Sequence, residues 1–219
     1  MTGKAMSALT RHPESPFAAP DWHADVAQLL DEHHLVASSH VARRRLHFAS
    51  SLSHFLGGLR DAEVCTFYGQ FITDMESFCR QLEQAVPGPL LERRLDGPGG
   101  IASLLRRRQY FSSRPPSKFR FYVWHDADHL LRNDRALFGR IVDTMAGVAA
   151  ESEYCDDDLL LIHRAVFVGG PLLDLYAEDP SGQFQSWACD PGHDEPFWEV
   201  VTGIERPPML RYAIDQLIH

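Results

Sequence analysis

An aromatic run near the middle of the chain, residues 119–124, limits the possible folds more than any other segment. Four of its six side chains are aromatic, and none of the six is Gly or Pro. Such a segment is typical of a β-strand that is buried on both faces. A clean helical pattern follows from about residue 134, where Asn133 or Asp134 can cap the helix. The run therefore predicts an interior strand that leads into a helix.

Two further strands are expected, one on each side of this run in the sequence. Residues 64–68 are rich in β-branched and aromatic side chains and stop at Gly69, and residues 159–168 form another apolar run. Helical patterns at 73–86, 101–108 and 134–151 separate the three strands, and Thr73 and Glu76 are expected to form a capping box at the start of the first of these helices. Strands separated by helices favour parallel pairing with right-handed crossovers. The predicted fold class is α/β, with a small, mainly parallel three-stranded sheet and helices packed against it.

The predicted organisation is one α/β domain over residues 21–219, preceded by a flexible arm at 1–20 that contains three prolines. Within the domain, residues 21–60 are expected to form a helical extension, with one helix from Asp21 and another at about 38–59. Residues 63–168 form the βααβαβ core. Residues 169–219 are expected to form a β-hairpin from 172–176 and 184–187, followed by a C-terminal helix near 209–218.

Charge and cysteine usage point to a cytoplasmic protein that does not bind nucleic acid in a general way. The formal net charge of −9 comes from residues 156–219, and an acidic surface repels phosphate backbones. The four cysteines, Cys65, Cys79, Cys155 and Cys189, are widely spaced, as expected for buried thiols in a reducing compartment. The sequence shows no signal-peptide pattern and no apolar run long enough to span a membrane, so no membrane association is predicted.

Several common catalytic motifs are missing from the sequence. The end of the aromatic strand superficially resembles the metal-holding strand end of a P-loop ATPase, but no G-x-x-x-x-G-K-[ST] or G-x-G-x-x-G segment occurs. Gly97-Pro-Gly-Gly100 supplies no lysine. No G-x-S-x-G nucleophile elbow occurs either. Nucleotide hydrolysis and serine-nucleophile chemistry are therefore not predicted.

One cluster could hold a divalent metal ion: His125, Asp126, Asp128 and His129, directly after the aromatic strand. The two histidines share a helix face at i, i+4 spacing, as in zinc-binding helices, but the glutamate of H-E-x-x-H is absent. The two aspartates also match the D-x-D element of nucleotide-sugar glycosyltransferases, which holds a cation against a diphosphate. In the competing interpretation, Asp126 or Asp128 caps a turn, the histidines lie at the sheet edge, and the protein has no cofactor.

A basic cluster offers a candidate surface for a partner. Arg106, Arg107 and Arg108 follow one another, with Tyr110 close behind. These side chains could contact phosphate or an acidic protein surface. The alternative is a solvated basic helix end, which also suits the helix dipole.

From residue 64 to about 168 the order of elements resembles that of the barstar family of small intracellular ribonuclease inhibitors. Residues 67–82 (FYGQFITDMESFCRQL) resemble the family's first strand, glycine turn and first helix, and residues 99–105 fall where its second, partner-facing helix would lie. Residues 119–124, 134–151 and 159–162 resemble the remaining β-α-β. The resemblance implies a three-stranded parallel sheet with helices packed against it.

The chain departs from that family at the second helix. There the family presents acidic and aromatic residues to the basic active site of a ribonuclease, whereas this chain has no acid in residues 99–105 and continues into Arg106–Arg108. No functional residue can therefore be transferred. The expected function is a non-catalytic module that binds another protein, as an inhibitor, immunity protein or assembly subunit. The alternative is a metal-dependent transferase or hydrolase that uses the cluster at 125–129.

Overall fold

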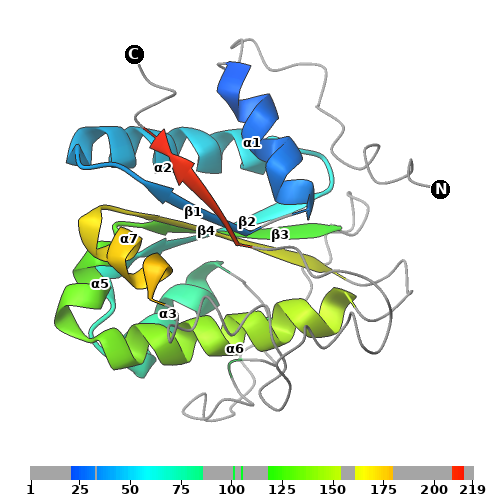
Figure 1. The fold of residues 1–219 in the computed structure, drawn as a ribbon. Coiled ribbons are helices and arrows are strands. Elements are labelled where there is room, and N and C mark those ends of the chain that lie inside the picture. Colours follow the sequence, from blue (N-terminus) through cyan, green and yellow to red (C-terminus); the bar gives the residue numbers. More distant parts are fainter. Residues whose placement is uncertain are drawn as a thin grey trace.

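A computed structural model of the chain describes residues 21–32, 34–85, 101, 105, 118–153, 161–179 and 209–214. Five strands of this part form one sheet in the order β2-β3-β4-β1-β5, with every neighbouring pair parallel (Figure 1). The strands are β1 (His34–Ser38), β2 (Ala62–Tyr68), β3 (Phe119–His125), β4 (Ile162–Gly169) and β5 (Met209–Ala213). The predicted α/β class and parallel pairing are confirmed, but the sheet has more than the three predicted strands.

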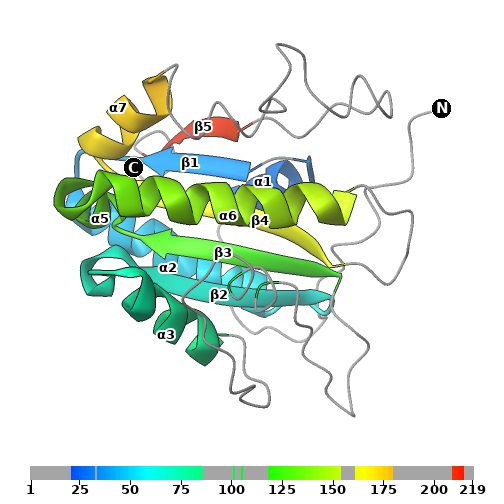
Figure 2. The ribbon, with the colours of Figure 1, turned by 90° about the horizontal axis from the view of Figure 1, so that it is seen from below.

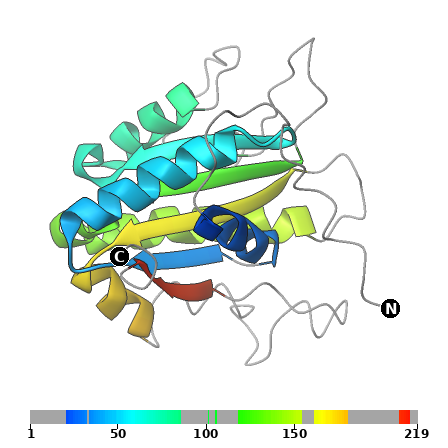
Figure 3. The ribbon, with the colours of Figure 1, turned by 90° about the horizontal axis from the view of Figure 1, so that it is seen from above.

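Helices cover both faces of the sheet and give three layers (Figure 1). On one face lie α1 (Asp21–Glu32) and α2 (Ala42–Gly57), seen in front of the sheet in Figure 3. On the other face lie α3 (Met75–Ala85) and α6 (Arg135–Glu153), seen in front in Figure 2. The short helices η1 (Gly69–Phe71), α5 (Ala127–Asn133) and α7 (Pro171–Glu178) follow the ends of β2, β3 and β4. Within the described residues, no helix is both long and apolar enough to cross a bilayer.

The segment predicted as a helical extension, residues 21–60, contributes a strand to the sheet. Between its two helices lies β1, which pairs with β4 on one side and with β5 on the other. Four of the five β1 residues are buried. The helices α1 and α2 therefore flank a strand of the main sheet, and the sequence interpretation missed this strand because it is only five residues long.

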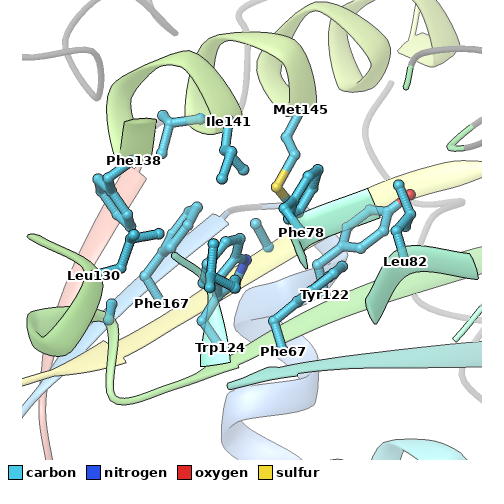
Figure 4. Packing of buried hydrophobic residues seen from close by; sticks show 14 of the residues in the cluster. Phe67, Phe78, Leu82, Tyr122, Trp124, Leu130, Phe138, Ile141, Met145 and Phe167 are labelled. Atoms are coloured by element: carbon cyan, nitrogen blue, oxygen red, sulfur yellow. The ribbon is translucent and has the colours of Figure 1, made fainter. Parts of the chain in front are cut away.

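The core has two halves, one on each face of the sheet, and β3 contributes to both. All seven residues of β3 are buried, so the predicted interior aromatic strand is confirmed. Tyr122 and Trp124 face α3 and α6, where they pack with Phe67, Phe78 and Phe167 (Figure 4). The alternate residues of β3 belong to the half covered by α1 and α2. Apolar residues of this half include Trp22, Val26, Leu30, Phe48, Leu52, Phe119, Phe121, Val123, Val166 and Val168.

Two of the cysteines lie in the described part of the chain, and both fit the prediction of buried thiols. Cys65 and Cys79 are buried, and neither forms a disulfide within the described residues. Burial raises the pKa of the Cys65 thiol to about 12. Such a thiol stays protonated near neutral pH and is a poor nucleophile. Cys155 and Cys189 lie outside the described residues.

Helix caps confirm one prediction and correct another. The Asp134 carboxylate accepts a hydrogen bond from the Leu137 amide at 2.8 Å, as predicted for the start of α6. At α3, Thr73 and Glu76 do not form the predicted capping box. Asp74 instead accepts from the Ser77 amide at 2.7 Å, and the Ser77 hydroxyl accepts from the Thr73 amide at 2.9 Å. The hydrogen bond from the Ser77 amide lowers the pKa of Asp74.

The C-terminal region differs from the prediction in two elements. Residues 171–178 form helix α7, where the first hairpin strand was expected, and Pro171 occupies its first turn. Residues 209–213 form β5, where a helix was expected, because Leu35 and Val36 of β1 provide a parallel partner for them. The second predicted hairpin strand at 184–187 and the predicted arm at 1–20 lie outside the described residues, as does most of the predicted helix at 101–108.

Candidate functional site

The fold places its candidate site at the carboxyl ends of the strands, between β1 and β4. All strands are parallel, so their carboxyl ends share one edge of the sheet. From β1 the chain runs through α2 to β2, at the edge of the sheet beyond β4 and β3. From β4 it runs through α7 toward β5, at the opposite edge beyond β1. Adjacent strands whose connections leave in opposite directions mark the usual ligand site of open α/β sheets. We call this place, formed by Ser39, Arg45, Asp128 and Gly170, the switch point.

At the switch point a carboxylate of the protein itself occupies the place of an anionic ligand. Asp128 Oδ1 accepts hydrogen bonds from the amides of Gly170 at 2.8 Å and Leu173 at 2.9 Å, and Oδ2 accepts from Leu172 at 3.3 Å. These amides belong to the first turn of α7, and a helix N-terminus is a common binding site for phosphate and other anions. In this protein the buried Asp128 fills that position.

The arginine of the switch point is also held by internal partners. Arg45 Nη1 donates to the Ser39 carbonyl at 2.9 Å, and Nη2 lies 3.7 Å from Asp126 Oδ1. A Cβ atom added at Gly170 would lie 3.0 Å from Arg45 Nη1 and 3.0 Å from Asp128 Oδ2, so Gly170 leaves just enough space for both side chains. Asp128 and Arg45, the charged residues beside Gly170, therefore both have partners within the protein.

The connection from β1 to α2 is too short to cradle a phosphate. It consists of Ser39, His40 and Val41, without glycine or lysine. A phosphate-binding P-loop between a strand and a helix needs several glycines, whose amides face the phosphate, and a lysine. This geometry agrees with the lack of a nucleotide-binding motif in the sequence.

The four predicted metal ligands lie in different surroundings in the structure. Asp128 caps α7, and Asp126 is the left-handed residue (φ 53°) of the turn between β3 and α5, near Arg45. His129 is half-buried in the first turn of α5. Within the described residues, no three His, Cys, Asp or Glu side chains lie close enough together to hold a metal ion. The competing interpretation, in which an aspartate acts as a cap, fits Asp128. Asp128 lies in α5, however, and the helix that it caps is α7.

His125 is buried at the end of β3. It is 7% exposed, and neither of its ring nitrogens has a hydrogen-bond partner among the residues that the structure describes. The ring packs against Tyr68 of β2 with their centroids 4.8 Å apart. Burial lowers the pKa of His125, so the ring is neutral near physiological pH.

Close backbone contact joins the turns that follow β2 and β3. A Cβ atom at Gly69 would lie 2.4 Å from the carbonyl oxygen of Asp126, so only glycine fits at this position. Contacts of α5 with η1 and with α7 continue the row of elements along this edge. The turns after β2, β3 and β4 therefore form one connected surface.

The sequence interpretation did not find the apolar residues exposed at this edge. The large apolar side chains exposed within the described part of the chain are Val41 (46%), Leu46 (62%), Tyr68 (41%), Phe71 (63%) and Leu175 (62%). Each lies at or shortly after the end of a strand. Val41 and Leu46 follow β1, Tyr68 is the last residue of β2, Phe71 follows β2, and Leu175 follows β4. In the sequence, their position at or after a strand end is the only feature that could have indicated them. We call these five residues the edge surface.

The basic surface predicted at Arg106, Arg107, Arg108 and Tyr110 lies outside the described residues. Its neighbour Leu105 is described and is buried, and its carbonyl accepts a hydrogen bond from Arg120. Whether those three arginines contact a partner therefore stays a prediction.

The three strands covered by the barstar resemblance, β2, β3 and β4, lie side by side in that order. In the whole sheet, β1 and β5 extend this group beyond β4. Comparison with protein-family models, with curated proteins and with solved structures finds no match to this chain. The function is therefore inferred from the geometry of the strand ends.

Proposed function

We propose that this chain is a non-catalytic protein-binding module that contacts its partner through the edge surface. The observation that carries the proposal is the position of Val41, Leu46, Tyr68, Phe71 and Leu175, which follow three strand ends at a single edge of the sheet. Single exposed apolar residues are ordinary. Several of them at one edge, among them two aromatic residues, are typical of a protein interface.

Tyr68 and Phe71 form the aromatic part of the edge surface. Their ring centroids are 6.1 Å apart, and Tyr68 also rests on the buried ring of His125. A tyrosine or phenylalanine on a rigid support gives a large contact area at a small cost in side-chain entropy. Residues of this kind often supply most of the binding energy of an interface.

The charged groups of the switch point, Asp128 and Arg45, support binding over catalysis. Catalytic acids and bases need a free polar atom directed at a substrate. At the switch point both oxygens of Asp128 bind backbone amides, and Arg45 binds the Ser39 carbonyl. These contacts fix the turns of the edge and thereby support the apolar residues on it.

Photo-crosslinking tests the proposal. Benzoylphenylalanine is placed at Phe71 in the full chain, and the protein is irradiated in a lysate of its native host. We expect one discrete protein adduct, which should be lost when Leu46 is also replaced by Asp. The same probe at Arg60, an exposed residue in the turn before β2 at the opposite end of the sheet, is the matched control and should give no such adduct. Equal labelling from positions 60 and 71, or none from position 71, would contradict the proposal.

The metal-dependent alternative has its own test. The melting temperature is measured with Mn²⁺, Zn²⁺ and Mg²⁺, because an ion that binds the folded state raises it. We expect no ion-specific increase. An increase that disappears in Asp126→Asn would favour the alternative, and Asp126 is preferred to Asp128 for this test because Asp128 caps α7.

A further inference from the structure

His125 is a buried polar side chain whose two ring nitrogens are both left without a polar contact in the described part of the chain. A neutral imidazole has one N–H donor and one acceptor nitrogen. Burying such groups without partners is unfavourable, because the hydrogen bonds to water are lost and nothing replaces them. Buried polar groups without partners are rare in folded proteins, so each one calls for a physical explanation.

The His125 ring packs against the aromatic part of the edge surface. Its centroid lies 4.8 Å from that of Tyr68, which is 41% exposed and in turn contacts Phe71. The backbone of Tyr68 is fixed, since its amide donates to Gln81 Oε1 at 2.9 Å and its carbonyl accepts from Gln81 Nε2 at 3.3 Å. The side chain of Tyr68 packs on the rings of His125 and Phe71, and exposed side chains change rotamer readily.

We infer that Tyr68 covers a polar subsite of the edge surface, and that a group of the partner hydrogen-bonds to the His125 ring once the Tyr68 side chain rotates away. The group is an uncharged hydroxyl or amide, because such a group can donate to the acceptor nitrogen or accept from the N–H. A charged group fits less well, since it would lose its water beside a neutral ring. The inference rests on the proposed function and names the chemistry of one contact with the partner.

This subsite would give the edge surface a means of choosing its partner. Apolar side chains such as Phe71 supply contact area but discriminate weakly between apolar partners. A partner without the polar group would cover the His125 ring and leave it unpaired, and an unpaired buried group lowers affinity. His125 is therefore expected to act in specificity.

The covering role of Tyr68 is tested on the full chain alone with diethylpyrocarbonate, which modifies the neutral histidine rings that it can reach. Peptide mass spectrometry gives the rate at each histidine. Tyr68→Ala should raise the rate at His125 about tenfold or more and leave the rates at the exposed His47 and His54 unchanged. Phe71→Ala, which removes the neighbouring exposed ring, is the matched control and should leave the rate at His125 unchanged. An unchanged rate in Tyr68→Ala, or an equal increase in Phe71→Ala, overturns the inference.

The contact with the partner is tested with the adduct formed by benzoylphenylalanine at position 71 in the full chain. His125→Phe keeps a ring against Tyr68 but removes both nitrogens, and it should reduce the adduct about tenfold. His125→Gln restores an uncharged donor and acceptor and should retain most of the adduct. His54→Phe makes the same change as His125→Phe at an exposed residue in the last turn of α2, and this control should retain the adduct. Circular dichroism and the melting temperature of each variant establish that it is folded.

The outcomes separate this inference from the proposed function. An adduct that survives His125→Phe, or that falls equally in His125→Gln or in His54→Phe, overturns the polar subsite and leaves the proposed function standing. No adduct from position 71 overturns both. If His125→Phe does not fold, the purified adduct of the chain with His125 intact decides. In that adduct His125 should react with diethylpyrocarbonate more slowly than in the free chain, and an equal rate overturns the inference.

Discussion

Asp128 is the residue on which the geometry of the switch point most depends. It lies in α5, yet its carboxylate completes the first turn of α7, which begins more than 40 residues later in the chain. The same carboxylate fills the position that an anionic ligand would take at this helix end. One side chain therefore both fixes the turn after β4 and closes it to phosphate.

Replacing Asp128 should destabilise the protein. In Asp128→Ala the amides of Gly170 and Leu173 lose a buried acceptor, which should cost about 2 kcal/mol of the free energy of unfolding. Asp128→Asn keeps one carbonyl oxygen and should cost about half as much. Urea denaturation measures both values. Asp25→Asn, at an exposed position of α1, is the control and should have little effect; an equal loss in Asp25→Asn and Asp128→Ala would contradict the role of Asp128.

His125 should make the protein sensitive to mild acid. Its pKa is lowered in the folded state by burial, so the unfolded chain takes up a proton at a pH where the folded chain does not. The free energy of unfolding should therefore fall as the pH drops below about 6.5, with a one-proton limit of about 1.4 kcal/mol per pH unit. His125→Phe, which keeps a ring against Tyr68, should lessen this fall between pH 7 and pH 5.

The measurement for His125 is urea denaturation at several pH values. His47→Asn, a change at an exposed histidine of α2, should leave the pH dependence as it is in the unchanged protein. If His125→Phe loses as much stability from pH 7 to pH 5 as the unchanged protein does, His125 is not a source of the acid sensitivity.

At the scale of elements, a buried ion pair joins β2 to β3 near the start of both strands. Arg120 is fully buried, and its Nη2 lies 2.7 Å from Glu63 Oε2. Glu63→Ala would leave the guanidinium buried without its carboxylate and should cost about 3 kcal/mol of the free energy of unfolding. Replacing both residues, with Glu63→Leu and Arg120→Met, should restore much of that loss because the buried charge is gone.

An exposed ion pair provides the comparison for this prediction. Arg80 and Glu76 lie on the surface of α3 at 3.4 Å, and Arg80→Ala should cost about 0.5 kcal/mol or less. Urea denaturation of the three variants gives the values. Similar losses for Glu63→Ala and Arg80→Ala would show that the buried pair does not contribute as described.

The elements that could be predicted from the sequence are those whose signal is local. The aromatic residues of β3, the apolar spacing of α6 and the cap at Asp134 are all visible within a few residues. The elements that were missed depend on distant partners. The short strand β1 is fixed by β4 and β5, residues 209–213 become a strand because β1 lies beside them, and the cap of α7 comes from Asp128. The residues close to these elements in the sequence do not indicate such contacts.

At the scale of the whole molecule, the sequence predicts where the candidate site residues lie in the sheet but not which groups they contact. The sequence located His125, Asp126, Asp128 and His129 at the end of an interior strand, which the structure confirms. It could not show that Asp128 turns to α7 or that Asp126 lies near Arg45, because both contacts follow from the strand order. For the same reason, the exposed positions of Leu46 and Phe71 could not be told from core positions.

The strand order also brings the residues of the proposed binding surface together. Parallel strands bring all their following turns to one edge, and Asp128 and Arg45, beside Gly170 at the centre of that edge, bind backbone groups of the protein. The exposed groups there include the five apolar residues of the edge surface, and arginines lie at the start of α2. The edge is therefore suited to a protein surface.

The affinity of the purified partner, once the adduct has identified it, tests this account most directly. Calorimetric titration compares the unchanged protein with a variant that carries Leu46→Asp and Phe71→Asp. Because exposed side chains contribute little to folding, the variant should keep its melting temperature, and its dissociation constant should rise about 100-fold or more. An unchanged dissociation constant in a folded variant would show that the partner binds elsewhere and would contradict the account.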